Sequence, residues 1–179
     1  MSQQPLTILG IPIPSDSPVF LGALAVHVVA GLGAVLAGAV AMLSPKRPGR
    51  HSRLGRVYFR CLAVVTVTMA LLSAMRWRED YHLFALGVLA AAAALAGLSG
   101  VRRRPRALRT HVVGFGASYI LMLTAFYVDN GKNLPLWNRL PTAAYWVLPA
   151  LVGVPLIVRA LLTHPLLRSA VRRPAGAGD

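Results

Sequence analysis

The amino-acid sequence predicts an all-α, five-span transmembrane helical bundle with its N-terminus outside and its C-terminus in the cytoplasm. Composition is the first observation: 56% of the 179 residues are hydrophobic, 13% are charged and the mean hydropathy is +0.60. Soluble domains carry roughly 25% charged residues. The second observation is that long apolar runs alternate with short polar connections. The third is an uneven distribution of positive charge between these connections, which predicts the orientation.

The apolar runs predict the membrane spans. Each has about the 20 residues that an α-helix needs to cross roughly 30 Å of hydrocarbon. We expect one domain, residues 19–165, between an extracytoplasmic Pro-rich lead-in at 1–18 and a basic cytoplasmic tail at 166–179. The expected spans are residues 19–43, 57–75, 81–99, 110–128 and 143–163.

The positive charge is concentrated on one side of these spans. Fifteen of the nineteen Lys and Arg residues fall in segments 44–60 and 100–110 or between Arg159 and the end. The other four are matched by acids in the alternate connections, so the basic set carries the whole net charge of +14. Lys and Arg are enriched in cytoplasmic loops. We therefore expect a multi-pass protein of the cytoplasmic (inner) membrane, whose arginines contact anionic lipid headgroups rather than nucleic acid.

The first expected span is rich in small residues. Ala23, His27, Gly31 and Val35 recur every four residues and so lie on one face of a helix. Small residues on a face let a neighbouring helix approach closely, which is the usual packing device inside lipid. Ser44-Pro45 is expected to end this helix.

The second span carries three hydroxyl side chains that can bond back to their own helix, those of Thr66, Thr68 and Ser73. Segment 76–81 (Arg-Trp-Arg-Glu-Asp-Tyr) predicts a compact outer hairpin with aromatic side chains at the interface. The third span is mostly alanine and leucine, and we expect it to be a packing helix.

The fourth span begins at Thr110-His111, and its glycines lack the preceding strand that a nucleotide-binding loop requires. Pro149 and Pro155 predict a kink in the fifth span. Between these spans, residues 129–142 form the longest polar stretch outside. Its candidate site residues are Asp129, Asn130 and Trp137.

Histidine provides the main candidates for chemistry. His27 lies about eight residues into the first span, roughly 12 Å below the outer surface. An ionisable side chain at that depth is costly and is a functional candidate; the alternative is a neutral imidazole bonded to a neighbouring hydroxyl or carbonyl. His82 lies at the outer edge of the third span, whereas His51, His111 and His164 lie towards the inside.

Axial ligation of a b-type haem needs two histidines from different helices at one depth. His27, His111, His51 and His82 are the candidate cofactor ligands, although His27 is about a helical turn or more deeper than His82. No HxxxH or HExxH spacing occurs, so any metal site must be assembled from separate segments. The sequence does not indicate which metal such a site would bind.

A second candidate site lies on the cytoplasmic side. His51, Arg53, Arg56 and Tyr58 predict a dense polar patch, with Arg109 at the same level. Such a patch is suited to an anionic lipid headgroup, a quinone head or a haem propionate. The alternative is an electrostatic anchor without a specific ligand.

Several stretches together resemble a known family. They are His27-x-x-x-Gly31, His51-Ser-Arg-Leu-Gly55-Arg-Val-Tyr58, His111 at the start of the fourth span, and Ala125-Phe-Tyr-Val-Asp-Asn-Gly131-x-x-Leu-Pro135-Leu-Trp137 followed by Tyr145-Trp-x-x-Pro149. Over about residues 20–165 the chain is similar to the bacterial membrane-protein family catalogued as domain of unknown function 2306. The resemblance implies a small helical bundle with polar residues near its loops, and it implies no activity.

The residues predict a small integral membrane protein without assigning its activity, and they suggest one sharp hypothesis and two alternatives. The leading hypothesis is a haem- or quinone-linked redox module, with His27 and His111 as the ligands and haem b as the cofactor. One alternative is a non-enzymatic structural or partner-binding protein that forms homo-oligomers, or binds a membrane partner, through its small-residue faces. The other is a small-solute transporter.

Overall fold

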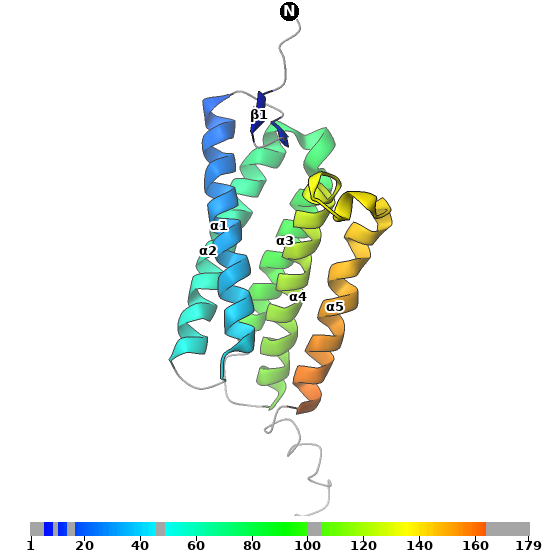
Figure 1. Cartoon of the computed structure of the whole chain (residues 1–179). Coiled ribbons are helices and arrows are strands. Elements are labelled where there is room, and N and C mark those ends of the chain that lie inside the picture. The colour runs from blue at the N-terminus through cyan, green and yellow to red at the C-terminus, as the bar shows by residue number, and fades with distance from the viewer. Residues whose placement is uncertain (1–5, 9–10, 14–16, 46–48, 100–104, 164–179) are drawn as a thin grey trace, which may run out of the picture. The chain divides into compact units, whose positions relative to one another are not determined.

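The computed structural model of the chain describes residues 6–8, 11–13, 17–45, 49–99 and 105–163, and these contain five α-helices (Figure 1). Each helix is long and apolar enough to cross a membrane, as the predicted multi-pass class requires. The tail at 166–179 and parts of the lead-in lie outside the described residues. The helices are α1 (Pro18–Leu43), α2 (Arg50–Met75), α3 (Trp77–Ser99), α4 (Pro105–Asn130) and α5 (Thr142–Thr163).

The lead-in contains a small departure from the all-α prediction. Strand β1 (Leu6–Ile8) pairs antiparallel with β2 (Ile11–Ile13), with Leu6 opposite Ile13. Ile and Thr are β-branched and favour extended backbone. The all-α class therefore holds for the spans, and the correction is confined to this short ribbon.

The helices extend beyond the apolar runs that predicted them. Helix α2 begins at Arg50 rather than at 57, and the connection from α2 to α3 shortens to Arg76. The expected outer hairpin at 76–81 is therefore mostly the first turn of α3. Arg76 pairs there with Asp80 at 3.5 Å and with Glu79 at 4.0 Å. Apolarity marks the part of a helix inside hydrocarbon, whereas backbone hydrogen bonds continue into the headgroup layer.

Two short 3₁₀ turns lie between α4 and α5. They are η1 (Gly131–Asn133) and η2 (Trp137–Arg139). Helix α5 contains Pro149 and Pro155 and is α-helical on both sides of each proline.

The chain divides into two compact units, and the boundary falls within α3. Unit 1 comprises Met1–Val88 with Asn133–Asn138, and unit 2 comprises Leu89–Lys132 with Arg139–Asp179.

In unit 1, α1 and α2 lie side by side along their length (Figure 1). Phe20 and Ala23 of α1 pack with Leu72 of α2 near one end, and Leu24 packs against this cluster. The buried face of α1 is largely alanine, as expected where two helices approach closely. Its buried residues are Phe20, Ala23, Ala34, Ala37, Gly38 and Ala41.

In unit 2, α3 and α4 make a close backbone contact. A β-carbon on Gly114 would lie 2.6 Å from the carbonyl oxygen of Ala93 and 2.6 Å from the Cα of Gly97. Real β-carbons do not approach backbone atoms this closely, so only glycine fits at position 114. The expectation that the third span is a packing helix is borne out at this contact.

Helices α4 and α5 also pack in unit 2 (Figure 1). The contact is reciprocal: Ile157 of α5 lies over Gly116 of α4, and Ile120 of α4 lies over Gly153 of α5. Each glycine leaves room for the isoleucine of the other helix.

Candidate functional site

A hydrogen bond between His27 and Thr68 joins α1 to α2 within their apolar parts. His27 is half-buried and lies about 14 Å along α1 from Pro18. Its Nδ1 is 3.0 Å from the Oγ1 of Thr68. The Thr68 Oγ1 also lies 2.8 Å from the carbonyl oxygen of Val64 and 3.1 Å from that of Val65.

These distances assign the tautomer of His27. A threonine hydroxyl has one proton, and a carbonyl oxygen can only accept. The Thr68 proton is therefore donated to the backbone of its own helix, and the Thr68 oxygen accepts from the Nδ1–H of His27. A neutral ring protonated at Nδ1 carries its lone pair on Nε2. The hydrogen bond fixes both the tautomer and the direction of the ring.

This geometry is compatible with a ligand-binding role of His27 and also with a purely structural one. A hydrogen bond from Nδ1–H to a neighbouring oxygen is the arrangement by which proteins orient a histidine whose Nε2 binds a metal. The same bond also satisfies a neutral imidazole that serves only to hold two helices together. The side chain of His27 thus joins two helices inside the apolar region of unit 1.

His51 caps the end of the preceding helix. Its Nδ1 lies 2.9 Å from the carbonyl oxygen of Ala41, in the last turn of α1. That carbonyl would normally accept from the backbone N–H four residues later, but this position is Pro45, which has none. The Ser44 N–H reaches Ala41 at 3.3 Å, and His51 supplies a second donor. The structure thus gives His51 a local structural role.

His111 makes a similar contact in unit 2. Its Nδ1 lies 3.2 Å from the carbonyl oxygen of Gly97, in the last turns of α3. Its ring packs on Phe115 with centroids 4.9 Å apart, and Phe115 itself lies over Gly97. Because a carbonyl oxygen only accepts, both His51 and His111 donate through Nδ1.

The three histidines of unit 1 lie at different depths. Ser73 bonds the carbonyl of Asp80 at 3.4 Å, which aligns the ends of α2 and α3. With Met69 against Gly87, Thr68 is roughly level with Gly87. His27 is therefore about 7 Å farther from the α2–α3 connection than His82, whose ring meets Tyr81 edge-on.

His51 is farther away still. Its partner Ala41 lies about 21 Å along α1 from His27. Two axial ligands of one haem must lie on opposite sides of the same iron. Among the described residues of unit 1, no second histidine therefore lies at the depth of His27.

The predicted cytoplasmic patch is divided between two faces of α2. Arg53 and Arg56 are exposed, whereas the side chain of Tyr58 is 3% exposed and belongs to the buried face. His51 is half-buried at the end of α1. Arg109, on α4 of unit 2, is exposed.

The outer-loop candidates lie at the end of α4 and in η2. The Asn130 side-chain amide donates to Asp129 at 3.2 Å and to the carbonyl of Phe126 at 3.1 Å. Asp129 is exposed, and Trp137 is half-buried.

Sequence reasoning missed one contact in this region. A β-carbon on Gly131 would lie 2.7 Å from the ring of Tyr145, which is 5% exposed. The Tyr145 hydroxyl donates to the carbonyl of Leu140 at 3.5 Å. The glycine thus makes room for an aromatic ring at the start of α5. Both residues belong to the stretches that resemble the family, but a linear sequence does not pair them.

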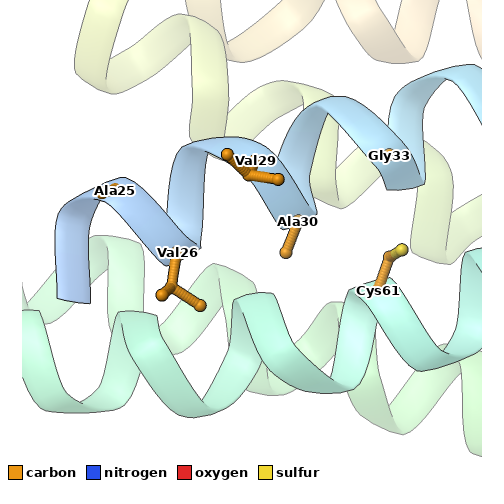
Figure 2. A pocket seen from close by; sticks show the side chains of 6 residues that line it. All are labelled: Ala25, Val26, Val29, Ala30, Gly33 and Cys61. Atoms are coloured by element: carbon orange, nitrogen blue, oxygen red, sulfur yellow. The ribbon is translucent and has the colours of Figure 1, made fainter. Parts of the chain in front are cut away.

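Two further features concern ligand binding. Among the described residues, no group of three or more His, Cys, Asp or Glu side chains is arranged to hold a metal ion; His164 lies outside that part. An apolar groove of about 550 Å³ lies between α1 and α2 (Figure 2). The groove is lined by Ala25, Val26, Val29, Ala30, Gly33 and Cys61.

Comparisons with models of known protein families, with curated proteins and with solved structures give no match to this chain. The resemblance inferred from the sequence stays a prediction.

Proposed function

We propose that the protein is a quinone- or haem-linked redox module of the cytoplasmic membrane, in which His27 is the binding imidazole. The observation that carries the proposal is the hydrogen bond from His27 Nδ1–H to Thr68, which places the lone pair of the ring on Nε2. An Nε2 lone pair inside the bilayer accepts a hydrogen bond from a hydroquinone or donates to iron.

A quinone headgroup is the favoured ligand of the two. Binding a hydroquinone hydroxyl requires one imidazole, which is what unit 1 provides at the depth of His27. When bound, the quinone supplies the electron transfer. The role of the chain is to hold the ring of His27 in one tautomer through Thr68 and to accept a proton at Nε2.

The proposed orientation places the basic ends of the helices in the cytoplasm. Arg50, Arg53, Arg56 and Arg60 lie at the start of α2, whereas the α2–α3 connection pairs Arg76 with acidic side chains. This asymmetry supports an extracytoplasmic N-terminus. A reporter fused after Asp179 is expected to be cytoplasmic, and an extracytoplasmic signal there would reverse the assignment.

The test uses one sample of detergent-purified protein from a host with adequate haem and quinone. Bound quinone is extracted and quantified, and optical spectra are recorded before and after dithionite. We expect co-purified quinone that is lost in His27→Ala and retained in the control His82→Ala. A Soret band with a reduced α-band, lost in His27→Ala, would instead assign haem b. A folded, monodisperse protein with neither group would refute the redox proposal.

Assembly with a second protein is the other candidate function, and the open face of α1 favours it. A β-carbon on Gly31 would meet no atom within 4 Å, and Val28 and Leu32 beside it are exposed. A small, open position on a membrane helix is suited to close approach by another helix. In this case Gly31→Leu disrupts oligomers or a complex, measured by crosslinking in membranes, while His27→Ala leaves them intact.

A further inference from the structure

One exposed face of α2 changes from basic to apolar along its length. At about 100° per residue, Arg53, Arg56 and Arg60 fall within an arc of roughly 60°. Apolar side chains continue the same stripe towards Met75. The members of this α2 stripe, all exposed, are Arg53, Arg56, Val57, Arg60, Val64, Val67 and Leu71.

The opposite face of α2 is the one that packs inside unit 1. Tyr58, Leu62 and Met69 lie about 140–180° from Arg53 and are buried, each 8% exposed or less. The α2 stripe is therefore directed away from the core of unit 1. Within the described ranges, the ion pairs are those of Arg76 with Glu79 and Asp80, and none involves an arginine of the α2 stripe.

The three arginines are at headgroup depth. Counting back from Met75, about 20 residues span the hydrocarbon and reach Arg56, so Arg53 lies in the headgroup layer. Arg60 is about one turn deeper. In a helix the Cα–Cβ bond tilts towards the N-terminus, which is here the basic end, so the long Arg60 side chain reaches back towards Arg56. The long side chain of Arg60 can thus reach the headgroup layer in which Arg53 and Arg56 lie.

We propose that the α2 stripe binds an anionic phospholipid from the leaflet at the basic end of α2. Arg53, Arg56 and Arg60 hold the phosphate, and the acyl chains lie along the exposed Val64, Val67 and Leu71. Guanidinium groups bind phosphate oxygens through two parallel hydrogen bonds. The apolar part of the stripe favours a lipid over a soluble phosphate. The acyl chains of a lipid would cover Val64, Val67 and Leu71, whereas a soluble phosphate would contact only the arginines. This proposal is independent of the redox proposal.

The test compares charge removal at this face with equal charge removal elsewhere. The test variant is Arg53→Gln/Arg56→Gln/Arg60→Gln. The control is Arg102→Gln/Arg103→Gln/Arg104→Gln, which removes three charges from the α3–α4 connection. Full-length proteins are purified in detergent, checked by circular dichroism and gel filtration, and titrated with phosphatidylglycerol or phosphatidylcholine. Bound lipid is counted by native mass spectrometry.

We expect the wild type and the control to bind phosphatidylglycerol equally well, and the test variant to bind it roughly 10- to 100-fold more weakly. Phosphatidylcholine should bind weakly to all three. Excess glycerol 3-phosphate should not displace the lipid; displacement would show that the phosphate alone is recognised and would overturn the lipid assignment. Equal losses in test and control would show that the arginines act as a diffuse anchor.

A further variant keeps the test decisive if the glutamine substitutions prevent folding. Arg53→Lys/Arg56→Lys/Arg60→Lys retains the charge but loses the planar fork that binds phosphate in pairs of hydrogen bonds. We expect this variant to fold and to bind phosphatidylglycerol several-fold more weakly than the wild type. Unchanged affinity would contradict a specific site.

Discussion

The Nδ1 of His27 on α1 donates a 3.0 Å hydrogen bond to the Oγ1 of Thr68 on α2. Thr68 can accept this bond because its own proton is donated to the backbone of α2 at 2.8 Å. The Thr68 hydroxyl therefore donates to the backbone of its own helix and, as an acceptor, fixes the tautomer of His27 on the neighbouring helix. The pair is the link between packing and the proposed function, since the same bond supports both.

The coupling of this pair can be measured by a double-mutant cycle. Thr68→Val removes the acceptor, and His27→Ala removes the donor. Side-chain hydrogen bonds between membrane helices contribute about 0.6 kcal/mol on average and up to about 1.7 kcal/mol. We expect an interaction energy in this range from unfolding in SDS, followed by circular dichroism. Thr68→Ser is the control, because it keeps the hydroxyl. Strictly additive effects of the two substitutions would show that the bond does not stabilise the fold.

His51 and Pro45 give a second prediction about a shared acceptor. His51→Ala removes a donor from the Ala41 carbonyl and is expected to destabilise the protein by about 1 kcal/mol. In a Pro45→Ala background the new backbone N–H can serve that carbonyl, so the cost of His51→Ala should fall. The comparison uses the same unfolding assay in both backgrounds. An equal cost in both would mean that His51 acts through contacts other than the Ala41 carbonyl.

The apolar runs predicted the spans because the bilayer requires about 20 apolar residues to cross it. They underestimated the lengths of the helices, which extend beyond the apolar runs at their ends. Helix α2 starts at Arg50, seven positions before the apolar run that predicted it. The headgroup layer imposes no apolarity, so charged residues continue a helix there without any signal in hydropathy.

The site was predicted only in part, because the sequence does not show which side chains of different helices contact each other. Hydropathy identified His27 as a polar group at depth, and Thr68 was noted as a residue that bonds to its own helix. Which hydroxyl meets which imidazole depends on the rotation of two helices about their axes, and a single sequence does not specify that rotation. The separation of Tyr58 from Arg53 is different, because helix geometry alone predicts it: at about 100° per residue the two lie about 140° apart around α2, one buried and one exposed.

The α3–α4 contact predicts a strong dependence on the size of one residue. Gly114→Ala would place a methyl group 2.6 Å from the Ala93 carbonyl oxygen, and a backbone atom cannot move aside without shifting a helix. We expect a loss of about 2–3 kcal/mol or more in the free energy of unfolding. The control is Gly31→Ala, whose methyl meets no atom within 4 Å. That control should be neutral or stabilising by up to about 1 kcal/mol, because alanine favours helix. Equal effects at the two positions would contradict the close contact.

The α4–α5 contact predicts a milder effect that can be rescued. A β-carbon on Gly116 would lie 2.6 Å from the Cδ1 and Cγ1 atoms of Ile157, which belong to a side chain rather than to backbone. Gly116→Ala should therefore cost about 1–2 kcal/mol, less than Gly114→Ala, because the isoleucine can change rotamer. Ile157→Ala removes both clashing atoms and leaves space for the new methyl group.

The double variant Gly116→Ala/Ile157→Ala should therefore be more stable than the sum of the two single changes predicts, by about 1 kcal/mol. The measurement is the same SDS unfolding of all four proteins, with Gly22→Ala as a glycine control whose methyl meets no neighbour. Rescue would demonstrate that the two helices interlock at this residue pair, because a general gain in helix propensity from alanine would appear equally in Gly22→Ala. Additive losses would mean that Ile157 already moves aside in the single variant, and that the backbone contact at Gly114 is the size-restricted position on α4.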